Sequence, residues 1–196
     1  KLDAYSPLGY SSAGTVIGVA DDVTEFRVGD KVACAGAGYA NHAEVVAVPK
    51  NLCVRLEADA DLAKACYNTL GAIALQGVRQ ADMRLGETCA VIGLGLIGQL
   101  ACLELRASGV NVVGIDVSAA AVKTASEHCT DLALTRNDPG IKEKILDYTD
   151  GRGVDAVLIA AATSSLDPIN FAGAICRRKG RIVVLGAVPT GFDRDP

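Results

Sequence analysis

Hydrophobic runs and helical patterns alternate along the chain from residue 88 onward. Residues 88–92 form a short apolar run rich in strand formers, and five apolar side chains then recur at the spacing of one helix face: Leu96, Ile97, Leu100, Leu103 and Ala107. Later strands are predicted at 111–115, 132–135, 154–161 and 182–185, and helices at about 119–128, 141–148 and 166–176. This alternation predicts a parallel α/β sheet covered on both faces, in the doubly wound order 3-2-1-4-5.

The pattern before residue 60 is different. Short apolar runs at 14–20, 31–34, 42–48 and 53–56 are separated by turns rich in glycine and aspartate and lack a helical period. They predict a β-rich region of the barrel or sandwich kind, followed by a helical stretch from 60 to about 80. The sequence therefore predicts two domains, over 1–64 and 65–196.

A glycine motif follows the strand at 88–92. Gly93, Gly95 and Gly98 have the spacing G-x-G-x-x-G. The first glycine permits a tight turn, the second lets a pyrophosphate approach the backbone, and the third lets a helix lie against the sheet. The free amides of Leu96 and Ile97 would then face the phosphates from the positive end of the helix. Because small residues also pack helices on sheets where nothing binds, the motif alone leaves a structural role open.

An acidic residue ends the second strand of this region. Asp116 lies 23 residues beyond Gly93, close to the roughly 20 expected for the carboxylate that binds an adenosine ribose. Its charge would repel a 2′-phosphate, and residues 117–121 offer no arginine to hold one. The sequence therefore predicts NAD rather than NADP. The alternative is that Asp116 is a solvated acid that caps the next helix.

Composition excludes several classes of partner. The chain has 196 residues, of which half are hydrophobic, and a net charge of −4 without basic clusters, which argues against nucleic acid and anionic membranes. No uninterrupted apolar run reaches the roughly 18 residues of a membrane span. Seven separated cysteines in mostly apolar surroundings, with no C-x-x-C, favour reduced thiols in the cytoplasm over disulfides or a zinc knot. A start without Met or signal suggests that a segment precedes Lys1.

Several strings, taken in order, resemble the medium-chain dehydrogenase/reductase superfamily. They are Gly14-Thr15-Val16, the run FRVGDKV at 26–32, Ala43-Glu44 after Gly38, and the glycine motif. The resemblance spans essentially the whole chain. It implies a GroES-like catalytic domain without its first strands, followed by a Rossmann coenzyme domain without its last strand.

The resemblance also implies a cofactor site. Gly93, Gly95, Leu96, Ile97 and Gly98 would hold the pyrophosphate, and Asp116 the adenosine ribose. Four small residues at the ends of the fourth and fifth strands would line the nicotinamide pocket, unless they are simple strand ends: Ala161, Ala162, Gly186 and Ala187.

The chain departs from the zinc-dependent members of that superfamily. Gly9-Tyr10-Ser11 stands where zinc alcohol dehydrogenases have Gly-His-Glu, and neither Tyr10 nor Ser11 is a usual zinc ligand. The four-cysteine lobe that should follow Val32 is missing. Cys66 matches a further ligand position only loosely and is interpreted as a packed helix residue, and His42 as structural. No zinc is therefore expected, and Tyr10 becomes the candidate proton donor, with a core tyrosine as the alternative.

The strings at 7–14 and 74–79 are also similar to two-domain oxidoreductases encoded near polysaccharide biosynthesis functions. The sequence therefore predicts a zinc-independent oxidoreductase that transfers a hydride between NAD(H) and a small or sugar-derived alcohol or carbonyl compound. A quinone or enone reductase, a non-catalytic nicotinamide-binding module and a methyltransferase are the alternatives. An open sheet edge would permit a homo-oligomer, and these residues alone are expected to be inactive.

Overall fold

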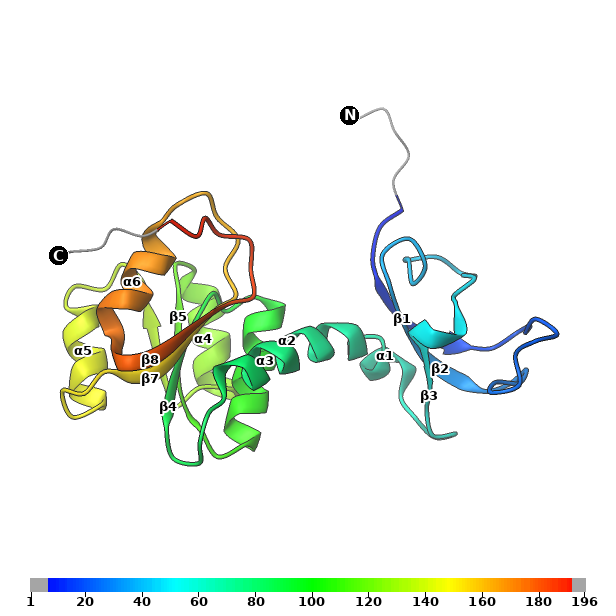
Figure 1. The fold of residues 1–196 in the computed structure, drawn as a ribbon, viewed down its shortest axis with the longest axis horizontal. Coiled ribbons are helices and arrows are strands. Elements are labelled where there is room, and N and C mark those ends of the chain that lie inside the picture. The colour runs from blue at the N-terminus through cyan, green and yellow to red at the C-terminus, as the bar shows by residue number, and fades with distance from the viewer. Residues whose placement is uncertain (1–6, 192–196) are drawn as a thin grey trace. The chain divides into compact units, whose positions relative to one another are not determined.

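The computed structural model describes residues 7–191, and the chain divides into two compact units, Lys1–Ala72 and Ile73–Pro196 (Figure 1). Within residues 7–191, none of the helices combines the length and the apolar character that a bilayer crossing requires. The domain boundary expected between residues 64 and 65 stays a prediction.

The first unit is built on a three-stranded antiparallel sheet. Strands β1 (Ser11–Thr15), β2 (Lys31–Ala35) and β3 (Cys53–Arg55) lie side by side in that order, and a short 3-10 helix, η1 (Lys50–Leu52), leads into β3. A small core forms over this sheet from Val32, Cys34 and Ala40, with four partly buried residues against it: Val16, Phe26, Val48 and Cys53.

Two expectations for the first unit are wrong. The strand expected at 14–20 begins and ends earlier, as β1, and the strand expected at 42–48 does not form. A strand needs a partner for its backbone groups, but residues 43–50 lie across a cavity from residues 12–20 instead of pairing with them. The apolar residues in this run, at 43 and 45–48, line the cavity instead.

The helical stretch expected at 60–80 is divided into α1 (Leu62–Ala65) and α2 (Asn68–Ala81). The hydroxyl of Ser11 donates to the carbonyl of Cys66 at 2.6 Å and accepts from the amide of Thr69 at 3.3 Å. The Ser11 side chain thus satisfies backbone groups on both sides of the break, which explains why the helix can be interrupted there.

The second unit is a five-stranded parallel sheet in the order β6-β5-β4-β7-β8, which is the doubly wound order expected. Its strands and helices alternate along the chain as β4 (Thr88–Ile92), α3 (Leu96–Ala107), β5 (Asn111–Asp116), α4 (Ala119–His128), β6 (Leu132–Thr135), α5 (Ile141–Tyr148), β7 (Val154–Ile159), α6 (Asp167–Ile175) and β8 (Cys176–Val184). The Rossmann-type α/β fold is thereby confirmed.

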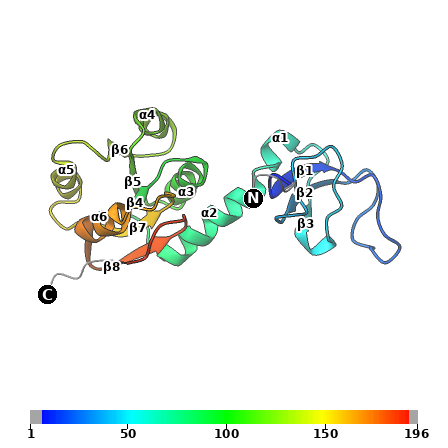
Figure 2. The same ribbon diagram turned by 90° about the horizontal axis from the view of Figure 1, so that it is seen from above.

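Helices cover both faces of this sheet (Figure 2). One core contains buried residues of α3 and α4 together with Ala74 and Ala81 of α2, while the other contains buried residues of α5 and α6. The three central strands, β4, β5 and β7, are almost continuously buried, as expected for a parallel sheet covered twice. The outer strands are less covered: β6 has one buried residue and β8 has none.

Strand β8 differs from its expected bounds. The turn predicted at 179–181 is present as a local irregularity, with Lys179 at φ +64° and a shift in pairing between Val154 and Ala156 of β7. Pairing with β7 begins before that irregularity, at Cys176, so the strand is longer than the predicted 182–185.

Candidate functional site

The glycine turn lies at the carboxyl end of β4, between β5 and β7. Gly93 has φ +97°, and its amide donates to the carbonyl of Ile115 at 2.8 Å. A Cβ atom at this position would lie 2.6 Å from the backbone nitrogen of Ala161. Both its backbone conformation and its surroundings therefore require glycine at position 93.

The other two glycines have opposite environments. A Cβ atom on Gly98 would collide with the carbonyl oxygen of Gly93, so Gly98 permits the start of α3 to lie against the turn. Gly95 is exposed, and a Cβ atom there would meet nothing within 4 Å. The position predicted for close approach of a pyrophosphate is thus the one glycine of the motif that faces open space.

No side chain caps the N-terminus of α3, at which Gly95 is the N-cap residue. Leu96 is exposed and Ile97 is half-buried at its first positions. The first amides of a helix have no partner within it and can therefore bind an anion. These residues fit the pyrophosphate of a dinucleotide.

Asp116 is joined to the glycine turn. Its Oδ2 accepts from the amide of Leu94 at 2.6 Å, and its Oδ1 accepts from the amide of Ser118 at 2.7 Å. The capping role considered as the alternative belongs to Ser118 instead, whose hydroxyl accepts from the amide of Ala121 at the start of α4. The half-buried carboxylate of Asp116 therefore lies at the edge of the sheet beside the turn.

Leu94 and Gln99 were not identified from the sequence. The amide of Leu94 donates to Asp116, and its carbonyl accepts from Nε2 of Gln99 at 2.8 Å. Leu94 is fully buried, so its side chain anchors the turn while its two backbone groups are held from β5 and α3. A buried apolar residue inside G-x-G-x-x-G was the only signal for this anchoring.

The residues after β7 and β8 meet at the same edge. The amide of Gly186 donates to the carbonyl of Ile159 at 2.9 Å, and the amide of Thr163 donates to the carbonyl of Ala187 at 3.0 Å. A Cβ atom on Gly186 would collide with the carbonyl oxygen of Ala161. The structure thus brings Gly93, Ala161 and Gly186 together through backbone atoms, with Ala162 and Ala187 exposed beside them.

Arg136 is a further charged residue at this edge, and no motif in the sequence marks it. Its amide donates to the carbonyl of Asp116 at 2.8 Å. Its guanidinium makes two hydrogen bonds to the carboxylate of Asp167, at 2.9 and 2.6 Å, and lies 4.0 Å from the ring centroid of Phe171. This positive charge is therefore neutralised by the start of α6.

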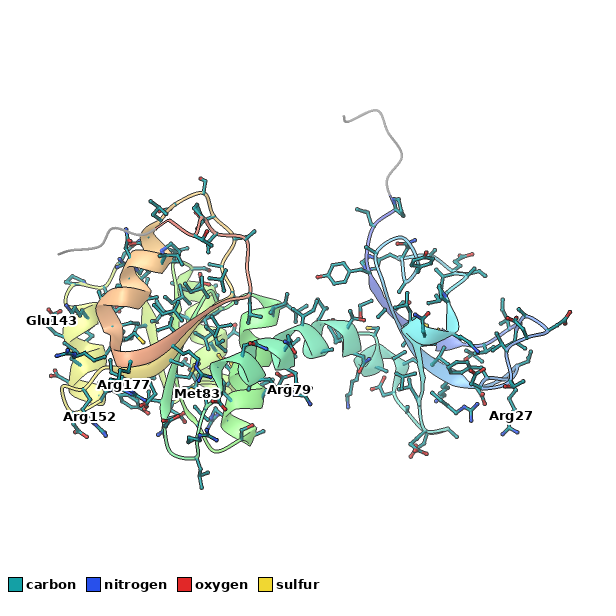
Figure 3. All side chains as sticks on the ribbon, viewed as in Figure 1. Arg27, Arg79, Met83, Glu143, Arg152 and Arg177 are labelled. Atoms are coloured by element: carbon teal, nitrogen blue, oxygen red, sulfur yellow. The ribbon has the colours of Figure 1, made fainter. Side chains whose placement is uncertain are left out.

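The opposite, amino edge of the sheet has a separate polar cluster. Arg177, labelled in Figure 3, bonds Oδ1 of Asp155 at 2.5 Å and lies 3.7 Å from Oε1 of Glu87. Oδ2 of Asp155 accepts from the amide of Thr88 at 2.8 Å. These charges join the beginnings of β4, β7 and β8 to one another, so we assign them a structural role.

The residues at the expected metal position lie in the first unit. The hydroxyl of Ser11 is engaged with the backbone of Cys66 and Thr69, and the thiol of Cys66 donates to the carbonyl of Ala63 at 3.1 Å. His42 lies against Gly9, where a Cβ atom would be 2.5 Å from its Nε2. Between residues 7 and 191 no three His, Cys, Asp or Glu side chains gather as a metal site would require, so this donor set does not fit a tetrahedral zinc ion.

Tyr10 is also in the first unit. Its carbonyl accepts from the amide of Gly36 at 3.0 Å, and its side chain is 39% exposed. The exposure argues against the alternative of a buried core tyrosine and leaves the phenol accessible.

Comparisons with known proteins agree with this architecture. A family model described as zinc-binding dehydrogenase matches residues 97–195. The D-guloside 3-dehydrogenase of Shigella flexneri is 32% identical over 154 residues, which are 77% of this chain and 43% of that protein. A protein of Schizosaccharomyces pombe named probable quinone oxidoreductase is 30% identical over 192 residues, 94% of this chain and 57% of that protein.

A solved structure of a mycobacterial protein complexed with NADPH has the same fold. Its TM-score is 0.79 at 23% identity, over 94% of this chain and 59% of that one. The chain thus spans between 43% and 57% of the two curated relatives described above.

The doubly wound sheet with a glycine turn and an acid at its carboxyl edge defines a Rossmann-type protein. The chain belongs to the zinc-binding dehydrogenase family, within the medium-chain dehydrogenase/reductase superfamily.

Proposed function

We propose that this chain is the dinucleotide-binding part of an oxidoreductase that transfers a hydride between NAD(H) and a sugar-derived alcohol or carbonyl compound without zinc. The observation that carries the proposal is the carboxylate of Asp116, held beside the glycine turn by the amide of Leu94. Both the anion-binding end of α3 and a ribose-binding acid are then present at one edge of the sheet.

The choice of NAD over NADP follows from charge. The Asp116 carboxylate would accept hydrogen bonds from the two ribose hydroxyls and repel a 2′-phosphate. The backbone of Arg136 is hydrogen-bonded to that of Asp116, and the Arg136 guanidinium is already bound by Asp167. The mycobacterial structure with NADPH shows that this fold also accepts the phosphorylated cofactor. The proposed preference of this chain for NAD over NADP therefore rests on its own Asp116 and Arg136.

Gly95 supports binding of the pyrophosphate because its backbone faces open space. Gly93, Gly98 and the amides of Leu96 and Ile97 complete that part of the proposed site. When bound, the nicotinamide would accept or give the hydride. Ala161, Ala162, Gly186 and Ala187 would let its flat ring lie against backbone atoms, since none has a side chain larger than a methyl group.

The reacting oxygen needs a group that stabilises or protonates it. We assign this role to the phenol of Tyr10, which is accessible and whose backbone is fixed by Gly36. Zinc would otherwise serve this purpose, but Tyr10 and Ser11 are poor ligands and the Ser11 hydroxyl is already engaged.

A sugar-derived substrate is supported by the relative from Shigella flexneri, which is named for a D-guloside. A quinone reductase is the second candidate, favoured by the relative from Schizosaccharomyces pombe, whose match extends over 94% of the chain. These two functions differ in the expected electron donor and acceptor, so one set of assays separates them.

The test is a fluorescence titration of this chain with NADH and NADPH, followed by turnover assays in the natural polypeptide that contains this sequence. We expect NADH to bind at least about tenfold more tightly, equivalent to ~1.4 kcal/mol, and NAD⁺ to be reduced with a methyl D-guloside. Tighter binding of NADPH together with reduction of a benzoquinone would establish the second candidate. Binding of NADH without turnover of either substrate would indicate a non-catalytic nicotinamide-binding module.

Two proposals concern the environment of the chain. Strand β8 is an edge strand of the sheet formed by the described residues, so a second copy could pair with it to form a homo-oligomer. Sedimentation velocity would detect this association. The seven cysteines suit a reducing, cytoplasmic location, which fractionation of cells would test.

A further inference from the structure

Strands β2 and β3 place two cysteines directly opposite each other. Cys34 and Cys53 are partners in the antiparallel register, and their sulfur atoms are 3.7 Å apart. Cys34 is buried, with 6% of its surface exposed, whereas Cys53 is half-buried. The pair lies wholly within the first unit and is separate from the proposed dinucleotide site.

The register also determines how close the two backbones are. The amide of Leu56 donates to the carbonyl of Lys31 at 2.9 Å, which makes Lys31 and Leu56 a hydrogen-bonded pair. Pairs of the two kinds alternate along an antiparallel ladder, so Cys34 and Cys53, three positions further, form a non-hydrogen-bonded pair. The Cα atoms of such pairs are about 4.5 Å apart, within the range of roughly 4.4 to 6.8 Å that a disulfide spans.

A cavity lies beside both cysteines. It has a volume of about 740 Å³, and Cys34 and Cys53 line it together with apolar residues that include Val16, Phe26 and Val48. Burial, followed by the neighbouring Cys53, raises the pKa of the Cys34 thiol to about 12, so that Cys34 remains protonated near neutral pH. The more exposed Cys53 is therefore the thiol that meets a reagent first.

We propose that Cys34 and Cys53 are a redox-active dithiol, which a peroxide or a small disulfide oxidises to an intrachain disulfide. With hydrogen peroxide, the Cys53 thiolate attacks one oxygen to form a sulfenic acid, and the other oxygen leaves as hydroxide, which takes up a proton to become water. The Cys34 sulfur then attacks the sulfenic sulfur, and its proton leaves with the displaced hydroxide as a second water. Two thiols are oxidised, and one peroxide is reduced to two waters.

The other cysteines provide internal comparisons. Cys102 and Cys129 interact with each other, but both are buried in the core of the second unit, out of reach of a reagent. Cys66 lies in the first unit and is half-buried like Cys53. Each of these two thiols donates to a backbone carbonyl, Cys66 to Ala63 at 3.1 Å and Cys53 to Pro49 at 3.5 Å. Cys66 is therefore the matched control for accessibility without a facing thiol.

The experiment treats the reduced chain with increasing hydrogen peroxide, alkylates the remaining thiols and maps the peptides by mass spectrometry. We expect the first product to join the peptides of Cys34 and Cys53, to be lighter by two hydrogen atoms and to revert with dithiothreitol, while Cys66 is alkylated. Phenylarsine oxide, a probe for neighbouring dithiols, should protect both cysteines at one equivalent.

Two variants test whether the crosslink requires Cys53 and not Cys66. Cys53→Ser should leave Cys34 alkylated after peroxide, and Cys66→Ser should preserve the crosslink. The proposal is overturned if Cys34 of the wild-type chain stays alkylatable after Cys53 has been oxidised, or if Cys53 joins Cys66 instead. The wild-type maps decide the question even if a variant does not fold.

Discussion

Oδ2 of Asp116 accepts a hydrogen bond of 2.6 Å from the amide of Leu94, which joins the end of β5 to the turn after β4. This bond gives the Asp116 carboxylate a fixed position and leaves lone pairs for another donor. The residue is therefore both a part of the turn and the proposed ligand of the ribose.

Replacing Asp116 with Asn should raise the Kd of NADH by about tenfold and reduce the preference over NADPH, because the repulsive charge is lost. Fluorescence titration with both cofactors measures this. Asp131→Asn is the control, since Asp131 accepts from the amide of Val112 at 2.7 Å near the amino edge of the same sheet. Equal losses in the two variants would show that the effect comes from the fold and not from the site.

Gly95→Ala separates cofactor binding from stability. The added methyl group meets no protein atom within 4 Å, so the Tm should fall only by the small cost of alanine at an N-cap position, but the methyl group fills the space proposed for the pyrophosphate. We expect NADH to bind at least about tenfold more weakly. Gly173→Ala, on an exposed face of α6 with equally open surroundings, should keep NADH binding and stabilise the chain by about 0.5–1 kcal/mol. Unchanged NADH binding by Gly95→Ala would remove the pyrophosphate from this position.

Tyr10→Phe should lower turnover in the natural polypeptide by roughly 10² to 10⁴ without changing the Kd of NADH, because only the proton-donating hydroxyl is removed. The pH dependence of kcat is measured for the same variant, because loss of a proton donor also changes how kcat varies with pH. Tyr67→Phe is the control, because Tyr67 is exposed in the same unit. If both variants turn over as fast as the wild type, Tyr10 has no part in proton transfer.

Chelation tests the proposed independence from zinc. Dialysis against a strong zinc chelator should change neither the turnover of the natural polypeptide nor the Tm of this chain, since Tyr10 and Ser11 supply no good ligand. Elemental analysis of the untreated protein provides the second measurement. One zinc ion per chain, lost together with activity, would contradict the proposal.

Glu104 on α3 should make stability depend on pH. Oε2 of Glu104 is buried without a hydrogen-bond partner, and burial raises the pKa of this carboxyl. When a carboxyl has a higher pKa in the folded state than in the unfolded state, the folded chain becomes less stable as the pH rises from the lower pKa to the higher one. The charged form of Glu104 therefore destabilises the chain at neutral pH. Glu104→Gln should therefore raise the Tm at pH 7 by roughly 1–3 °C but not at pH 4.

The control for this prediction is Glu127→Gln on α4, where the side chain is 53% exposed. Its Tm should follow that of the wild type at both pH values. A gain for Glu104→Gln that is the same at pH 4 and pH 7 would mean that ionisation of this carboxyl is not the cause.

The second unit could be predicted closely from the sequence. Helices α4 and α5 and strand β6 have the expected bounds, because their apolar positions follow a single period between clear turn residues. The strand order followed from the alternation of strands and helices. These features depend on local pattern and on a topology with few alternatives.

The first unit was less predictable because long-range contacts decide its structure. The short apolar run at 42–48 has the composition of a strand, but it pairs with no strand among the described residues. The break between α1 and α2 depends on the hydroxyl of Ser11, more than 50 positions earlier in the chain. Neither relationship can be inferred from a local window.

Residue type alone predicted the tight turn at Gly93 and the close packing of α3 at Gly98, both of which the structure has. The binding of a ribose by Asp116 stays a prediction. The contributions of Leu94, Gln99 and Arg136 were not predictable, because they act through backbone groups or through a distant partner. The hydrogen bond from Gln99 to the carbonyl of Leu94 and the pairing of Arg136 with Asp167 become visible only once the strands are aligned.

The contact of Gly93, Ala161 and Gly186 has a consequence for how this edge of the sheet can change during evolution. The floor of the surface at this edge consists of backbone peptide groups, which substitutions do not change. The shape of the floor depends on the absence of a side chain at Gly93 and Gly186. A single added methyl group at Gly93 or Gly186 would collide with the backbone of Ala161 and displace it, whereas exposed residues such as Ala162 and Ala187 can vary in size. Changes in ligand preference are then expected to arise at the rim of this surface, while its floor remains fixed.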